Sequence, residues 1–140
     1  MQTEPTVPEG FAPHFRQSPM TDPWEPLYSR RMPDGAVQLG LNAGPTHCNS
    51  RGFVHGGLIA TLADNAMGLS CVGGAGRIGS LVTVNLAIDY LASARIGQWV
   101  QVEPQLIKAG SSLCFVQALV TADGTPCARA NATFKVSVAA

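Results

Sequence analysis

GLIATLADNAMGLSCV, residues 57–72, is the stretch that decides the fold of this chain. It contains no proline, and a helix built from it carries apolar side chains on nearly every side. The glycine-rich run 73–76 that follows is a strong signal for a helix to stop. A helix that is apolar all round is a buried helix, so the rest of the chain is expected to cover it.

The segments on both sides of this helix have the alternation and turn residues of β-strands. We expect strands over residues 26–32, 37–41, 80–91, 98–109, 113–121 and 126–138. In the strand over 80–91, strict alternation puts Val82, Val84 and Leu86 on one face and Thr83 and Asn85 on the other. The fold class predicted is α+β, with one long central helix wrapped by a curved antiparallel β-sheet.

The length and the proline distribution predict one domain with an arm in front of it. A chain of 140 residues can bury a core of its own but is too short for two. Six of the ten prolines fall within the first 26 residues. Because proline cannot donate to helix or sheet ladders, residues 1–24 are expected to form an extended arm and residues 25–140 the single domain.

Composition excludes several classes of protein. Nine basic and nine acidic side chains cancel, so bulk charge attracts neither nucleic acid nor an anionic membrane. Charged residues make up only 13% of the chain, which favours a surface partly hidden against a second copy. The beginning of the chain lacks signal-peptide character, and the four cysteines are widely spaced. We therefore expect a cytoplasmic protein with buried or half-buried free thiols and no membrane segment.

Asp64 is the one ionisable side chain between His55 and Arg77. An ionised carboxylate in a dry helix costs several kcal/mol unless it is paired or functional. It lies about two turns from the helix start, too deep to cap it. A carboxylate bonded to a strand or to Asn65 is one reading. The other is a general base or nucleophile in a partly dry site.

The helix entrance carries a second candidate feature, His55-Gly56-Gly57. First-turn N–H groups lack intrahelical partners, and glycine lets a ligand approach them closely, as an oxyanion hole requires. Gly57 and Asp64 are seven residues apart, about 10 Å along a helix. One helix therefore cannot bring both to one carbonyl group, but a second antiparallel copy across a two-fold axis can. This spacing predicts an active site shared at a homodimer interface.

The motif Asn49-x-x-Gly52-x-x-His55-Gly56-Gly57-x6-Asp64-Asn65 resembles that of hotdog-fold acyl-CoA thioesterases. It is most similar to the phenylacetate-pathway and thioesterase superfamily member 2 group, over roughly residues 36–136. The resemblance implies hydrolysis of an acyl-CoA thioester to free acid and coenzyme A. It implies no cofactor and no metal, since coenzyme A enters as part of the substrate.

The same resemblance implies roles for single residues. Asp64 would be the base or nucleophile, and the Gly57 N–H would bind the thioester oxygen. Asn49 would position water or substrate, His55 would shape the same corner, and Thr83 would orient the water. Residues implied to bind substrate or coenzyme A are Gly56, Leu81, Val82, Lys108, Gly110 and Ser111.

Several alternatives stay open at this point. A hydratase or dehydratase could recruit His55 with Asp64, and a non-catalytic acyl-CoA binding module could use the same fold. Cys48 with His55 could form a thiol–imidazole pair, and His47 could join them around zinc, although a fourth ligand is missing. The acyl group is undetermined, and so are the roles of His47 and the arm. The choice between nucleophilic and general-base attack is also open. Because tetramers are common in the fold that the chain resembles, the choice between a dimer and a dimer of dimers stays open too.

Overall fold

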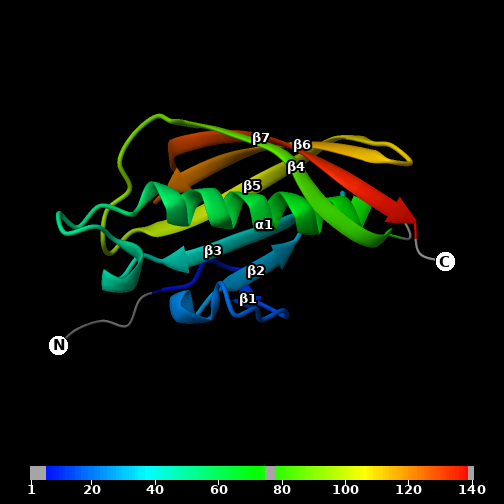
Figure 1. Ribbon diagram of the computed structural model, residues 1–140. Coiled ribbons are helices and arrows are strands. Elements are labelled where there is room, and N and C mark those ends of the chain that lie inside the picture. The colour runs from blue at the N-terminus through cyan, green and yellow to red at the C-terminus, as the bar shows by residue number, and fades with distance from the viewer. Residues whose placement is uncertain (1–5, 75–77, 139–140) are drawn as a thin grey trace.

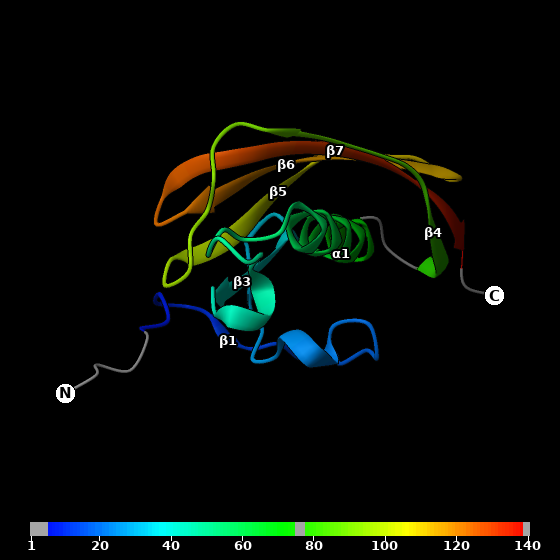
Figure 2. The same cartoon turned by 60° about the vertical axis from the view of Figure 1, so that its left-hand side comes forward.

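The computed structural model describes residues 6–74 and 78–138. Its long helix, α1 (Gly56–Gly74), lies along the concave side of an antiparallel sheet (Figure 1). Within the described residues the sheet has seven strands in the order β1-β2-β3-β5-β6-β7-β4. Figure 2 shows it curving around the helix from β4 over β7, β6 and β5 to β3. The predicted α+β architecture is confirmed.

The element bounds agree with the sequence prediction to within two residues at each end. The strands are β1 Ala12–Pro13, β2 Tyr28–Arg31, β3 Val37–Asn42, β4 Ile78–Tyr90, β5 Trp99–Ala109, β6 Leu113–Ala122 and β7 Thr125–Val138. Strand β1 and two 3-10 turns, η1 (Asp22–Trp24) and η2 (Pro45–His47), are additions that the sequence pattern did not predict. The expected stop of the helix is confirmed at Gly74, and the rest of that glycine-rich run lies outside the described residues.

The sheet-facing side of α1 forms the centre of the core. Leu62, Ala63, Ala66 and Met67 expose none of their surface. They belong to one cluster with the inward-facing side chains of β3, β5, β6 and β7. Ser70 is the polar residue on this side, and its hydroxyl bonds the Ala66 carbonyl at 2.7 Å and accepts the Val37 N–H at 3.0 Å. This bond joins the last turns of the helix to the start of β3.

Strand β4 contains a β-bulge that corrects the predicted alternation. Its register against β7 shifts between Thr83 and Asn85, leaving Val84 as the extra residue. Thr83 therefore faces inward opposite Phe134, whereas Val82 pairs with the exposed Lys135 and points outward. Strict alternation was wrong before the bulge because one inserted residue exchanges the two faces of a strand.

The N-terminal arm packs along the domain. The pairing of β1 with β2 and the bond from the His14 N–H to the Leu27 carbonyl, 2.9 Å, tie it to the sheet. Phe11 contacts the Trp99 ring edge-on, with centroids 5.1 Å apart. The blue segment in Figure 2 then passes beneath α1. The domain boundary at residue 24 stays a prediction.

His47 has a structural role that the sequence left open. Its ring is buried, with Nδ1 accepting the Gly44 N–H at 2.8 Å and Nε2 lying 3.0 Å from the Trp24 carbonyl oxygen. These partners require a neutral ring with the proton on Nε2, which donates to the carbonyl. His47 thus joins the loop before α1 to the arm.

Two further sequence expectations concern cysteines and membrane segments. Cys71, Cys114 and Cys127 are buried, and Cys48 is half-buried, as predicted. Burial raises the pKa of the Cys71 thiol, and a hydrogen bond with Cys114 adds to this. In the described part of the chain, no helix has the length and hydropathy needed to span a bilayer.

Candidate active site

Asp64 lies halfway along α1 on the side that the sheet leaves open. Its side chain is half-buried, and Oδ1 accepts a hydrogen bond of 2.8 Å from the Thr83 hydroxyl on β4. The β4 bulge makes this contact possible, because it turns Thr83 toward the helix. The structure therefore brings together two of the predicted catalytic residues. A donor at Oδ1 holds the carboxylate in one orientation.

The entrance of α1 is built from the three predicted residues and Tyr90. The His55 carbonyl accepts the N–H groups of Leu58 and Ile59, so His55 precedes the first turn. Its Nδ1 accepts the Gly57 N–H at 3.1 Å. The Tyr90 hydroxyl donates to the Gly56 carbonyl at 2.7 Å. A Cβ at Gly56 would lie 3.2 Å from the Tyr90 ring and hydroxyl, which accounts for glycine at this position.

Asn49 shapes the loop in front of the helix. Its Oδ1 accepts the N–H groups of Arg51 at 2.9 Å and Phe53 at 3.2 Å, as in an Asx-turn. The carboxamide oxygen is therefore engaged in the turn. The Nδ2 group is the part of this side chain that can donate to a substrate.

The two ends of the predicted site do not meet within one chain. Asp64 lies beside a cavity that neither Gly57, His55 nor Asn49 lines. The separation follows from the helix rise, about 10 Å over seven residues. Both ends of the predicted site lie on the same side of α1, which the rest of the described chain leaves open. It runs through the exposed Gly57, the half-buried Thr61, Asp64 and Asn65, and the exposed Val72.

A cavity of about 500 Å³ opens beside Asp64. This volume is within the usual range for small-molecule sites, roughly 300–1,000 Å³. Its walls come from α1, from the first half of β4 and from the arm. The lining residues are His14, Arg16, Ser18, Asp64, Asn65, Gly68, Leu69, Val72, Gly79, Ser80, Leu81, Thr83 and Phe134.

Gly68 lines this cavity at a point where two side chains come close to the helix. A Cβ there would lie 3.1 Å from Leu81 Cδ2 and 3.5 Å from Phe134 Cε1. Glycine inside a helix costs about 1 kcal/mol relative to alanine. Its place here is explained by the close approach of β4 and β7 to the helix.

The predicted binding residues are distributed unequally around this cavity. Leu81 lines it, but Val82 points to the other face of β4 and is 62% exposed. Lys108, Gly110 and Ser111 lie in or beside the β5–β6 hairpin, outside the cavity wall. The Ser112 carbonyl accepts the Val136 N–H at 2.8 Å, which places this hairpin near the strand end that flanks Leu81.

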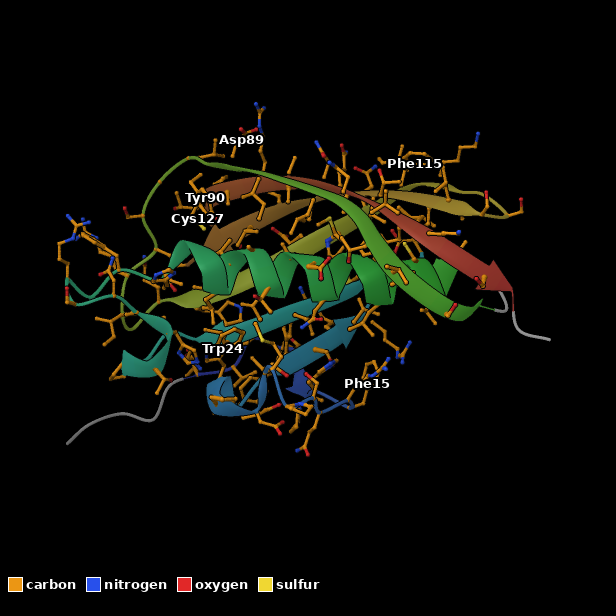
Figure 3. The ribbon with its side chains drawn as sticks, viewed as in Figure 1. Phe15, Trp24, Asp89, Tyr90, Phe115 and Cys127 are labelled. Atoms are coloured by element: carbon orange, nitrogen blue, oxygen red, sulfur yellow. The ribbon has the colours of Figure 1, made fainter. Side chains whose placement is uncertain are left out.

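Sequence reasoning missed the contribution of the arm. His14, Arg16 and Ser18 form one wall of the cavity, although they precede the recognisable motif by more than thirty residues. Burial lowers the pKa of His14; nearby Glu25 opposes this shift, and Arg16 and Arg31 reinforce it. In Figure 3 the labelled Phe15, between two of these residues, lies on the side of α1 away from β7. Spacing gives no signal of such a contact, because it depends on how the arm folds back.

The thiol and zinc readings of this region receive no support from the geometry. Burial raises the pKa of the Cys48 thiol, whereas a nucleophilic cysteine needs a lowered one. Among residues 6–74 and 78–138, no three histidine, cysteine or carboxylate side chains converge as metal ligands would. His47 is engaged on both ring nitrogens.

Comparison with known proteins identifies the class. The family model of the thioesterase superfamily matches residues 51–128. A Pseudomonas aeruginosa protein whose name assigns it to the esterases is 37% identical over 112 residues, covering 80% of this chain and 84% of that protein. Human acyl-coenzyme A thioesterase 13 is 33% identical over 93 residues, covering 65% of this chain and 64% of that protein.

Solved structures agree with this result. A Streptococcus mutans protein bound to acetyl CoA superposes with a TM-score of 0.74 at 26% identity, covering 82% of this chain and 91% of that chain. The chain belongs to the thioesterase superfamily, and it is a thioester hydrolase with the hotdog fold. The resemblance drawn from its sequence motif is confirmed.

Proposed function

We propose that this protein hydrolyses acyl-CoA thioesters, with Asp64 as the attacking base or nucleophile. The observation that carries this proposal is the Asp64–Thr83 hydrogen bond of 2.8 Å at the rim of a cavity of about 500 Å³. An oriented carboxylate beside a ligand-sized cavity is the arrangement that attack on a bound carbonyl requires. The names of the human thioesterase and the acetyl-CoA-bound structure support coenzyme A as the thiol.

The reaction needs a base and an oxyanion donor. In the general-base route, Asp64 takes a proton from water while the water oxygen bonds to the thioester carbon. The carbon–sulfur bond then breaks, the acid is released, and the coenzyme A thiolate takes up the proton. In the nucleophilic route, Asp64 bonds to the thioester carbon, the carbon–sulfur bond breaks and the coenzyme A thiolate leaves. Water then hydrolyses the mixed anhydride, which releases the acid, restores the Asp64 carboxylate and supplies the proton that the thiolate takes up. Either route places negative charge on the carbonyl oxygen, and the Gly57 N–H at the positive end of α1 would stabilise it.

His55 and Asn49 would complete the oxyanion corner. The bond between the Gly57 N–H and His55 Nδ1 fixes the direction of this N–H before substrate arrives. A thioester oxygen would take the place of the imidazole, or share the N–H with it. The Asn49 turn holds the loop beneath, and its Nδ2 would donate to substrate or water.

Two surface features support a site shared between subunits. Gly57 and Asp64 lie at different heights along the open side of α1. A second copy of the helix, antiparallel to the first, would place its Asp64 opposite Gly57 and its Gly57 opposite Asp64. Beside it, β4 ends the sheet with a 13-residue edge that carries the exposed Val82 and Val84, 62% and 60% accessible. A long apolar edge strand favours pairing with another strand. Two copies joined along β4 would cover both features at once.

Coenzyme A would enter as part of the substrate, and the mechanism requires no metal or other cofactor. Lys108, with Gly110 and Ser111 in the β5–β6 hairpin, would contact the coenzyme A chain. Their position at the end of the sheet near Leu81 fits a chain leading away from Asp64. The acyl group would occupy the cavity.

Thiol release from a panel of short, medium, long and aryl acyl-CoAs tests the proposal, with Asp64→Ala measured beside the wild type. We expect turnover in the wild type and its loss in the variant. Turnover that persists in Asp64→Ala would show that Asp64 is not the attacking base or nucleophile. Binding of coenzyme A without turnover by either protein would favour a binding module. A single turnover in ¹⁸O-labelled water then separates the two routes, because only the nucleophilic route leaves label in the Asp64 carboxylate.

A further inference from the structure

The arm-side wall of the cavity has a chemistry that thioester hydrolysis does not use. At the proposed reaction end of the cavity, Asp64 and Thr83 are joined by a hydrogen bond. The arm adds His14, Arg16 and Ser18 at another part of the same cavity. This cation and imidazole come from a different wall than the attacking carboxylate. We therefore expect them to contact a part of the substrate that does not react.

Arg16 differs from the other arginines near the arm in having no partner. Arg30 donates to Gln38 at 2.7 and 3.0 Å and to the Glu9 carbonyl, and Arg31 lies over the Phe15 ring at 4.7 Å. Within the described residues, Arg16 forms no ion pair, hydrogen bond or ring contact. The nearby His14 also holds a buried Nδ1 without a partner there. On this wall the exposed Arg16 guanidinium is thus available to a ligand.

Part of the remaining cavity lining is apolar. Leu69, Leu81 and Phe134 contribute side chains, and Gly68 lies where Leu81 and Phe134 approach the helix closely. Such a surface suits the methylene groups of an acyl chain. The lining thus combines the Asp64 carboxylate and Thr83 hydroxyl, several apolar side chains, and an arm guanidinium that has no partner among the described residues.

We infer that Arg16 binds the far end of the acyl group, and that the preferred substrates are acyl-CoAs whose acyl chain ends in a carboxylate. This inference rests on the proposed function and extends it to the substrate class. A guanidinium pairs with a carboxylate through two parallel hydrogen bonds, which gives both strength and direction. His14 would add a further donor or acceptor beside it. The arm would then act as the specificity element of the site.

Matched pairs of substrates test this inference. The ratio of kcat/KM for succinyl-, glutaryl- and adipyl-CoA to that for the alkanoyl-CoAs of the same carbon number is measured in wild type, Arg16→Ala, Arg16→Lys and Arg31→Ala. We expect the ratio to fall about tenfold or more in Arg16→Ala, as for loss of a charge-assisted bond, and to recover partly in Arg16→Lys. Arg31→Ala removes an equal charge from the same region outside the cavity wall, and should keep the wild-type ratio.

Non-hydrolysable thioethers of coenzyme A keep this test separate from the proposed function. The affinities of a carboxyalkyl and an alkyl thioether of equal length are compared by calorimetry in the same four proteins. A selective loss of carboxyalkyl binding in Arg16→Ala supports the inference even if no thioester is hydrolysed. Equal ratios in wild type and Arg16→Ala, or the same loss in Arg31→Ala, would overturn it while leaving hydrolysis at Asp64 untouched.

Discussion

The two sides of α1 use the same helix for different purposes. The side facing the sheet carries Leu62, Ala66 and Met67, which are fully buried. The other side carries Gly57, Asp64 and Asn65, which remain half-buried or exposed. The helix thus concentrates its stabilising contacts on one side and carries the candidate catalytic residues on the other.

The difference explains why a charge can stand in so apolar a helix. An aspartate on the sheet side would be an unpaired buried ion, at a cost of several kcal/mol. On the open side Asp64 keeps access to water, and Thr83 provides it with a hydrogen bond. Substitutions on the open side should therefore lower activity with little effect on stability, and substitutions on the sheet side should do the reverse.

Asp64→Asn, on the open side of α1, should have the largest effect, which is a loss of activity. The amide keeps the shape of the carboxylate but can neither take a proton from water nor attack a carbonyl. We expect kcat/KM on the best acyl-CoA to fall by about a thousandfold or more, in the range of general-base and nucleophile deletions. The thermal unfolding midpoint, measured by circular dichroism, should stay at or above that of the wild type. A variant that unfolds early would instead make Asp64 a structural residue.

Met67→Ala should show the opposite pattern. Its side chain is fully buried, so truncation leaves a cavity and should lower the free energy of unfolding by about 3 kcal/mol. Urea denaturation gives this value directly. At temperatures where the variant is folded, kcat should stay near that of the wild type, because Met67 lies outside the wall of the site cavity. A large loss of kcat with unchanged stability would contradict the assignment of stability to the sheet side of α1 and activity to the open side.

Ser70→Ala should lower the free energy of unfolding by a smaller amount, about 1–2 kcal/mol. The change leaves the buried Val37 N–H without the Ser70 hydroxyl that it now donates to at 3.0 Å. Denaturation measured beside Ser70→Thr, which keeps the hydroxyl, separates the lost bond from a change in packing. Equal stability of Ser70→Ala and the wild type would show that this bond adds nothing to the joint between α1 and β3.

Thr83→Val should have an effect about as large as that of Ser70→Ala, but on activity rather than stability. The variant loses the hydroxyl that orients Asp64, at nearly constant volume. We expect kcat/KM to fall about tenfold, corresponding to about 1.4 kcal/mol. Thr83→Ser, measured in parallel, should restore most of the activity. Unchanged kcat/KM in Thr83→Val would mean that the carboxylate needs no orienting donor.

Much of the fold could be predicted from local patterns. The apolar helix, its glycine stop and six strands follow from periodicity and turn residues, and Asp64 stands out as a charge in an apolar stretch. These features depend on neighbours in sequence. Gly57 could be singled out in the same way, since helix position alone decides which N–H groups lack partners.

The rest depends on contacts between distant segments. The β4 bulge adds one residue, which no alternation rule predicts, and it reverses the orientation of Thr83 and Val82. The wall formed by His14 and Arg16 depends on how a proline-rich arm returns to the helix. The bond between His47 and the Trp24 carbonyl likewise joins residues 23 positions apart. Each of these is a tertiary outcome that the local sequence does not encode.

The central claim, a site completed by Asp64 of one subunit and Gly57 of its partner, is tested most directly by complementation. Asp64→Ala and Gly57→Pro, which removes the N–H in a turn where proline is tolerated, are each inactive on this account. Co-expression with two different tags yields the mixed dimer, in which one site carries both changes and the other carries neither. The account predicts about half of the wild-type activity for this dimer. A mixed dimer as inactive as its two parents would contradict it.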